Sequence, residues 1–240
     1  MNKMQSTPKG KKEQMRQMFN RIATHYDSLN HIMSLNIDRS WRKRGVALVA
    51  QGRPQRILDL ATGTADLAIE MAERIPEAAV VGVDLSTEML AVGQEKVRKA
   101  GLTARVTLCE GDAEALPFEQ ATFDAVTVAF GVRNFADLPL CLREMHRVLR
   151  PEGRVMILEL STPANPLVRW CYECYAFHFL PWVGGLISSD KAAYRYLPAS
   201  IRAFHRPEAV VQMMREAGFQ EIVCERKCLG VAHIYYAKHG

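Results

Sequence analysis

Hydrophobic and polar residues follow two periods along this chain, and each period predicts a different kind of element. Short runs rich in β-branched residues predict strands at 56–60, 79–84, 105–109, 123–129 and 153–159. Apolar residues at helical spacing predict helices between these runs, at about 64–75, 87–100 and 138–149. Because strands that alternate with such helices form parallel β-α-β units, the pattern predicts a Rossmann-like α/β sheet with helices on both faces.

The alternation is absent from two segments. The N-terminal segment predicts an amphipathic helix, from apolar residues at helical spacing: Met15, Met18, Phe19, Ile22 and Ala23. After residue 160 the alternation stops, and it resumes with a helix near 207–217 and two strands that form a terminal pair, at 220–225 and 229–237. The intervening segment is aromatic and interrupted by prolines, so we expect an insertion above the carboxyl edge of the sheet, where open α/β sheets bind ligands.

Length and composition fit one globular domain. The 240 residues are 48% hydrophobic and 24% charged, and we expect a single domain over 1–240, with a helical arm at about 11–50 and a cap at about 160–205. The net charge of +5 is compatible with nucleic acid, anionic lipid or acidic substrates. The Lys and Arg residues are scattered and form no stripe, which does not favour nucleic acid.

Two features bear on location. The N-terminus lacks the apolar region of a signal peptide, so we expect a cytoplasmic protein. The apolar run 167–187 is long enough to span a bilayer, but Arg169, Glu173 and His178 lie inside it and Pro181 interrupts it, which argues against a spanning helix.

The six cysteines do not predict a disulfide framework or a metal site. In a cytoplasmic chain of this length they are expected to be reduced thiols. Cys171 and Cys174 have a metal-like spacing, but no second pair of ligands accompanies them.

The loop after the first predicted strand, "LDLATGTADL", resembles a dinucleotide-binding turn that lacks glycines. The three positions of a G-x-G-x-x-G motif hold Ala61, Gly63 and Asp66. A carboxylate in the first turn of the helix would repel a diphosphate, which otherwise uses that positive end. A ligand with an ammonium and a sulfonium would instead find Asp59 and Asp66 compatible, and S-adenosylmethionine is such a ligand.

Acidic residues also follow the next two predicted strands. Asp84 ends "VVGVD", where a carboxylate can accept hydrogen bonds from both ribose hydroxyls. Asp112 follows the third strand, where it could accept a hydrogen bond from an adenine amino group. Each acid alone could be a helix N-cap. Three acids after three successive strands favour S-adenosylmethionine.

The loop after the fourth strand, "FGVRNFAD", should face the methyl group that is transferred. It lacks the proline-aromatic motif that is common in enzymes that methylate amino groups of bases, so that activity is disfavoured. Arg133 and Asn134 supply donors that could hold a phenolate or carbonyl oxygen. The alternative is a surface loop with a solvated arginine.

Several segments together resemble the menaquinone/ubiquinone biosynthesis C-methyltransferases over nearly the whole chain: "FNRIATHYDSLNHIMSLNIDRSWR", "LDLATGTADL", "GDAEALPF", "FGVRNFAD", "EMHRVLRPEGRVMILELSTP" and "FHFLPWVGGLISSDKAAYRYLPASI". The resemblance implies a class I methyltransferase fold and methyl transfer from S-adenosylmethionine to a ring carbon of a polyprenylated quinol. The expected acceptor is demethylmenaquinol, and the benzoquinol precursor of ubiquinone is the alternative. A small phenol, sterol or lipid headgroup is a further alternative acceptor.

The resemblance also implies the residues that hold the cofactor. They are Thr64, Asp84, Asp112 and Ala113, and Gly63 stands beside Thr64 in the first loop. The chain departs from the family at Ala129, where serine is frequent, and at Asn36 and Ala65, where glycine is common. We expect Asn36 to tolerate a left-handed backbone and Ala65 to indicate a less strained turn.

Carbon methylation of a quinol requires removal of a hydroxyl proton and stabilisation of the oxyanion. We assign oxyanion stabilisation to Arg133 and orientation to Asn134; the base could be Tyr26, His178, Asp190 or an ordered water. The family resemblance suggests that the arm containing Tyr26 folds over the cofactor as a lid, which would exclude water.

The expected partners follow from this chemistry. A polyprenylated quinol needs an apolar groove that is open toward a membrane, so the aromatic insertion and the basic N-terminus suggest peripheral contact with lipid. A homo-oligomer is left open. Two rival functions, a non-catalytic RNA-binding module and a nicotinamide oxidoreductase, fit the scattered charges and Asp66 less well.

Overall fold

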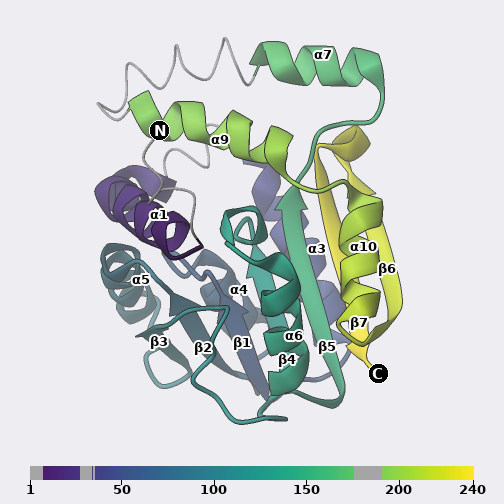
Figure 1. Cartoon of the computed structure of the whole chain (residues 1–240). Helices are drawn as coiled ribbons and strands as arrows, with labels where there is room; N and C mark the ends of the chain where they lie inside the picture. Colours follow the sequence, from purple (N-terminus) through teal and green to yellow (C-terminus); the bar gives the residue numbers. More distant parts are fainter. Residues whose placement is uncertain (1–7, 28–33, 35, 176–190) are drawn as a thin grey trace.

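The computed structural model describes residues 8–27, 34, 36–175 and 191–240. A seven-stranded sheet forms its centre, in the order β3-β2-β1-β4-β5-β7-β6 (Figure 1). The strands are β1 (Arg56–Leu60), β2 (Ala79–Asp84), β3 (Val106–Glu110), β4 (Phe123–Ala129), β5 (Leu149–Leu160), β6 (Phe219–Lys227) and β7 (Ala232–His239). Strands β1 to β5 are parallel, and β7 runs antiparallel to both of its neighbours.

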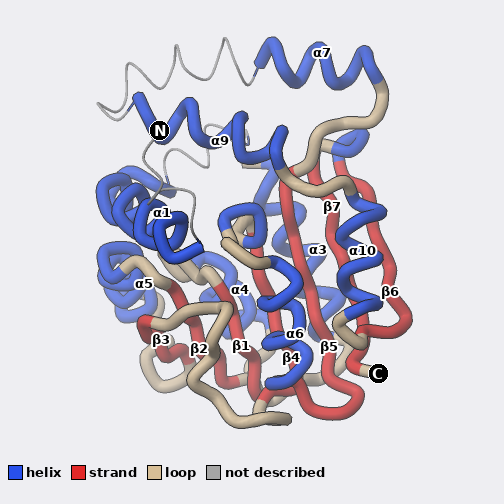
Figure 2. The backbone as a smooth tube through the Cα atoms, viewed as in Figure 1, coloured by secondary structure: helices blue, strands red, loops and turns tan. Residues whose placement is uncertain are grey.

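Helices cover both faces of this sheet (Figure 2). They are α1 (Pro8–Ile22), α3 (Ile37–Ala50), α4 (Asp66–Arg74), α5 (Thr87–Lys99), α6 (Leu138–Val148), α7 (Pro166–Cys174), α9 (Lys191–Ala203) and α10 (Pro207–Glu216). Short 3-10 helices are η2 (Ala23–His25), η3 (Val132–Asn134) and η5 (Cys228–Gly230). The predicted Rossmann-like fold with a mostly parallel sheet is confirmed.

The central strands are buried on both faces, which explains their continuous apolar runs. One core cluster joins the sheet to α6 and α10 through Leu142, Met145 and Met214. The other joins it to α3, α4 and α5, and Met71 and Val97 belong to it. The two layers leave the carboxyl edge of the parallel strands as the place where loops converge.

The last parallel strand begins earlier than its sequence pattern predicts. β5 starts at Leu149, directly after α6, and Leu149 pairs with Phe123 across an irregularity in the register. The helix before it ends at Val148, and the residues between Leu149 and Arg154 include Glu152 in a left-handed conformation. In the register with β4, Phe123 pairs with Leu149 and Ala125 with Arg154, so the intervening residues form an irregular segment and regular pairing begins near the predicted start of the strand at 153.

The turn at Ala65 contradicts the expectation of reduced strain. Ala65 has a φ of 65° and Ala61 a φ of 49°, so both adopt the left-handed backbone that favours glycine. The side chain of Ala65 is fully buried against its surroundings. The turn therefore keeps the shape that glycine would give it and stores strain beside the cavities, as functional loops often do. Asn36 is left-handed as expected, with a φ of 60°.

Two sets of helices lie over the carboxyl edge of the sheet. The arm helix α1 and the 3-10 helix η2 pack on α5, and Ile22 and Ala23 form a cluster with Met89. Helices α7 and α9 lie above the ends of β4 and β5 (Figure 1). His178, Pro181 and Asp190 lie outside the described residues. Within the described parts, no helix is both long and apolar enough to cross a membrane.

Candidate active site

Three neighbouring cavities lie at the carboxyl edge of the sheet. The first cavity lies under α1 and is lined by loops that follow β1 to β4, including Gly63, Asp84, Asp112, Ala113 and Asn134. The second is smaller and is lined by the first loop together with Arg42. The third is apolar and is lined by α3, α7, α9 and η5, with Arg133 in its wall. Phe130 lines all three.

Asp84 is fixed by the backbone at the end of β2. Its Oδ2 accepts a hydrogen bond from the Gly63 amide at 2.8 Å, and its Oδ1 accepts one from the Ser86 amide at 2.8 Å. Burial raises the pKa of this carboxyl, and backbone hydrogen bonds from Ser86, Gly63 and Leu85 oppose the rise. The carboxylate lines the first cavity, where its remaining lone pairs can accept two further hydroxyl donors.

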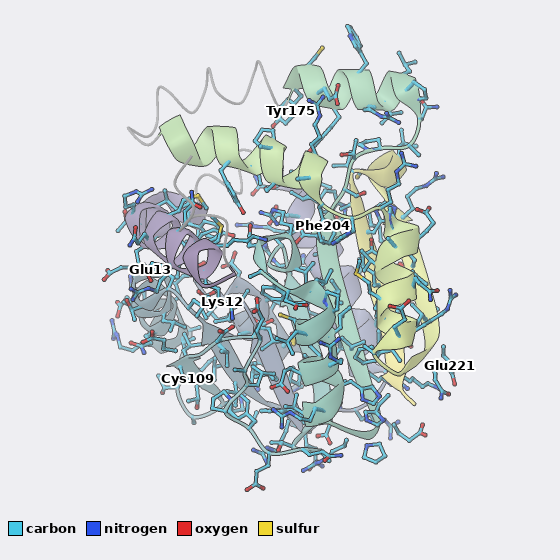
Figure 3. The ribbon with its side chains drawn as sticks, in the orientation of Figure 1. Lys12, Glu13, Cys109, Tyr175, Phe204 and Glu221 are labelled. Atoms are coloured by element: carbon cyan, nitrogen blue, oxygen red, sulfur yellow. The ribbon has the colours of Figure 1, made fainter. Side chains whose placement is uncertain are left out.

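Asp112 lines the same cavity but shares its carboxylate with the arm. Lys12 on α1 donates to Asp112 Oδ2 at 2.6 Å and lies 2.6 Å from Glu114 Oε2. Figure 3 shows Lys12 on the sheet side of α1 and Glu13 on the outer side. Burial lowers the pKa of Lys12, but its hydrogen bonds to Asp112 and Glu114 outweigh that effect and leave it raised. The arm therefore contacts the residue that was predicted to face adenine.

The Thr64 hydroxyl is also engaged by the arm. It donates to Asp27 Oδ1 at 2.5 Å, and Thr64 lines the second cavity and not the first. Lys96 bridges Asp27, at 2.7 Å, and Asp66. The charge of Asp66 is therefore compensated, and the repulsion of a diphosphate inferred from its sequence position is weaker than that position alone suggested.

Asp59 lies at the base of the second cavity. It accepts hydrogen bonds from the Thr62 hydroxyl at 2.7 Å and the Thr127 hydroxyl at 2.8 Å. Burial raises the pKa of this carboxyl to about 7, while the two hydroxyl hydrogen bonds lower it. Beside it, Ala129 contributes no hydroxyl where the family resemblance implies serine.

Arg133 is held in the wall of the third cavity by a buried ion pair. Its Nη1 lies 2.7 Å from Glu159 Oε1 and also donates to the Phe130 carbonyl, and its backbone amide donates to Glu159 Oε2 at 3.1 Å. Burial lowers the pKa of Arg133, but the attraction of Glu159 outweighs this and leaves it raised. Its buried Nε has no hydrogen-bond partner among the described residues.

Asn134 and Tyr26 stand on the other side of Phe130. Asn134 lines the first cavity, and its Oδ1 accepts a hydrogen bond from the Tyr196 hydroxyl of α9 at 2.7 Å. Tyr26 lines both the first and the second cavity. The predicted residues therefore surround the junction of the cavities, but Arg133 faces the apolar side and Asn134 the polar side.

Sequence reasoning missed several residues of this site: Lys12, Arg42, Glu159 and Tyr196. Lys12 and Arg42 belong to helices whose pattern predicts only one buried face, and no local signal indicates which cation turns inward. Tyr196 lies in the "YRYL" motif that supported the family resemblance, and its hydrogen bond to Asn134 gives that motif a structural role.

The described residues contain no group of three or more His, Cys, Asp or Glu side chains arranged to hold a metal. Thiols are free at Cys109, Cys141, Cys174, Cys224 and Cys228.

Sheet order and cavities at the carboxyl edge define a Rossmann-like methyltransferase fold. A SAM-dependent methyltransferase from Aquifex aeolicus aligns with a TM-score of 0.56 at 16% identity, over 78% of this chain and 82% of its own. A Thermotoga maritima structure, described as a SAM-dependent methyltransferase and possible histamine N-methyltransferase, aligns with a TM-score of 0.63 at 18% identity, over 94% and 100%. These likenesses concern the fold.

The chain belongs to the ubiE/COQ5 methyltransferase family, whose model matches residues 7–239. A demethylmenaquinone methyltransferase of Porphyromonas gingivalis is 46% identical over 94% of this chain and 92% of that protein. The enzyme of the same name from Thermus thermophilus is 48% identical over 91% and 98%. A ubiquinone/menaquinone biosynthesis C-methyltransferase of Geobacter sulfurreducens is 42% identical over 98% and 91%. The predicted family is confirmed.

Proposed function

We propose that this methyltransferase transfers a methyl group from S-adenosylmethionine to a ring carbon of a polyprenylated quinol, with demethylmenaquinol as the acceptor. The observation that carries the proposal is the placement of Phe130 between two kinds of cavity. On one side lie carboxylates suited to a nucleoside, and on the other lies a mostly apolar space whose charged lining residues are the buried Arg133 and Asp38. Relatives named demethylmenaquinone methyltransferase support the choice of acceptor.

The first cavity fits the nucleoside part of the cofactor. Asp84 would accept hydrogen bonds from the ribose hydroxyls, and Asp112 with Ala113 would hold the adenine. Gly63 would let the ligand approach the backbone, because its φ is 54° and it has no side chain to fill that part of the cavity. Thr64 and Tyr26 would border the amino-acid end in the second cavity. When bound, the cofactor supplies an electrophilic sulfonium methyl.

The third cavity fits the acceptor ring. Trp41, Tyr172 and Leu197 supply apolar walls, and Arg133 would stabilise the oxyanion that forms when a quinol hydroxyl loses its proton. Arg133 stays protonated, so it acts through charge and not as the base. Asn134, fixed by Tyr196, lines the first cavity and would orient the reacting ring from the junction of the cavities. Tyr26 is the described candidate for the base, while His178 and Asp190 lie outside the described residues.

The activity is tested with isotopically labelled S-adenosylmethionine and reduced demethylmenaquinone as acceptor. We expect a product that carries one labelled methyl group on the naphthoquinol ring, identified by mass spectrometry. The benzoquinol precursor of ubiquinone and a short phenol serve as competing acceptors in the same mixture. Label found on the phenol, on protein or on RNA, with none on either quinol, would overturn the proposal.

Peripheral contact with a membrane would deliver this acceptor. Three large apolar side chains near the third cavity are exposed: Leu167 by 70%, Trp170 by 64% and Leu229 by 65%. Leu167 and Trp170 lie on α7, whose Tyr172 lines that cavity. Exposed tryptophan and leucine beside an apolar cavity suit the boundary of a bilayer, where a polyprenyl tail begins.

The double substitution Leu167→Ser, Trp170→Ser is expected to lower binding to anionic phospholipid vesicles about tenfold, because two apolar side chains no longer enter the bilayer. Vesicle co-sedimentation at low salt measures this binding. Val223→Ser is the matched control, since Val223 is also exposed, by 51%, but lies on the edge strand β6. Equal binding to the vesicles by the unsubstituted chain, the double variant and Val223→Ser would contradict membrane contact through α7.

A further inference from the structure

Arg42 is a buried cation whose place in the site the preceding assignments do not explain. It lies on α3, is 7% exposed, and lines the second cavity together with Thr64 and Asp66. Of the described residues that line this cavity, it is the only Lys or Arg. Because a buried guanidinium is costly without partners, its hydrogen bonds indicate what it is placed to bind.

The hydrogen bonds of Arg42 leave one edge of the guanidinium unsatisfied. Nη1 donates to Asp38 Oδ2 at 2.6 Å. Nη2 lies 3.4 Å from Asp66 Oδ2, and Nε lies 3.9 Å from Glu70 Oε2. Nε is buried and has no hydrogen-bond partner within the described part of the chain. Nη2 is therefore held only by a long ion pair and Nε by no hydrogen bond, so this edge of the guanidinium is incompletely satisfied.

A carboxylate matches such a pair of donors. Two parallel N–H donors of an arginine bind both oxygens of a carboxylate, and this geometry is stronger than a single neutral hydrogen bond. The acids nearest to this edge do not complete it, since Glu70 is too far for a hydrogen bond and Asp66 is also bound to Lys96. A carboxylate that comes from a ligand could therefore complete the pairing of this edge.

The position of the second cavity identifies which part of the cofactor would reach Arg42. It shares the walls formed by Tyr26, Ala61, Gly63, Ala129 and Phe130 with the first cavity. A nucleoside held by Asp84 in the first cavity would extend its amino-acid end into the second. That end carries an ammonium, which suits Asp59, and a carboxylate, for which the described lining residues offer one cation.

We propose that Arg42 binds the α-carboxylate of S-adenosylmethionine through Nε and Nη2. Asp38 is then a positioning residue, which holds the guanidinium through Nη1. This inference rests on the proposed binding of the cofactor, but it does not depend on the identity of the methyl acceptor.

Isothermal titration of the whole chain with three ligands tests the assignment without catalysis. S-adenosylmethionine carries the carboxylate, decarboxylated S-adenosylmethionine lacks only that group, and methylthioadenosine lacks the whole amino-acid end. We expect the chain to bind S-adenosylmethionine at least about tenfold more tightly than the decarboxylated ligand. In Arg42→Gln this ratio should fall to about 1–3, while the affinity for methylthioadenosine stays unchanged.

Three further variants separate a direct contact from a structural effect. Arg39→Gln removes an exposed cation from the same helix and should keep the ratio of the unsubstituted chain. Arg42→Lys keeps the charge but loses the planar pair of donors, so an intermediate ratio is expected. Asp38→Asn weakens the ion pair that holds Arg42 but retains the guanidinium. It should therefore keep a higher ratio of the two affinities than Arg42→Gln.

Two results would overturn the assignment: equal binding of the two S-adenosyl ligands by the unsubstituted chain, or full discrimination retained in Arg42→Gln. If Arg42→Gln does not fold, the ligand pair on the unsubstituted chain and on Arg42→Lys decides the question. Failure of the chain to bind S-adenosylmethionine at all would refute the proposed function itself, which distinguishes the two proposals.

Discussion

Arg133→Ala is expected to lower kcat by about 10²- to 10³-fold, because removal of a donor to a developing oxyanion has effects of this size. The dissociation constant of S-adenosylmethionine should change little, since Arg133 lies in the wall of the apolar cavity. Single-turnover methyl transfer at saturating cofactor measures the first quantity, and titration measures the second. A loss of cofactor affinity with unchanged kcat would contradict the assigned role.

The same substitution should also destabilise the fold. It leaves Glu159 buried, 1% exposed, without its cation, and the removal of one partner of a buried pair costs about 3–5 kcal/mol. The matched control is the double variant Arg133→Ala, Glu159→Gln, which removes the unpaired charge. We expect it to recover much of the free energy of unfolding in urea but none of kcat. Recovery of kcat would mean that Arg133 acts only through stability.

Asp84→Ala is expected to weaken the binding of S-adenosylmethionine at least about 100-fold, because two charge-assisted hydrogen bonds from the ribose are lost. The substitution also leaves the amides of Gly63 and Ser86 without their acceptor. Titration with S-adenosylmethionine measures the loss.

Asp112→Asn is the comparison for this variant. The carboxylate of Asp112 would contact only one amino group of the ligand, and it already pairs with Lys12. We therefore expect a smaller loss of affinity for S-adenosylmethionine, about tenfold. An equal effect of the two substitutions would argue against separate contacts to ribose and adenine.

The order of strands and helices could be predicted from the sequence because both signals are local. The apolar runs at 56–60 and 123–129 have the same bounds as β1 and β4. A strand that is buried on both faces is a continuous apolar run, so the local sequence is enough to predict it. The start of the fifth strand was predicted too late, at 153, because the pairing of Leu149 with Phe123 across a register irregularity is not visible in the local pattern. The prediction was also wrong at Ala65, because a residue type does not report the dihedral angles that its surroundings impose.

The acids of the site could be predicted for a similar reason, and their partners could not. Asp84 follows directly from a strand end, which parallel topology places at the carboxyl edge. Lys12 and Arg42 reach the site from helices far from it in the sequence, so their role depends on how α1 and α3 pack. Charge alone did not distinguish them from exposed residues such as Arg39.

Phe130 has a consequence for the order of events in catalysis. Residues of α1 line one of the spaces that it separates, whereas α7 and α9 line the apolar one. With the proposed ligands, the cofactor that has lost its methyl group would leave the first cavity into water, beneath α1. The methylated quinol would leave the third cavity toward lipid, beneath α7 and α9. Neither departure has to wait for the other, so steady-state kinetics should follow a random sequence of product release.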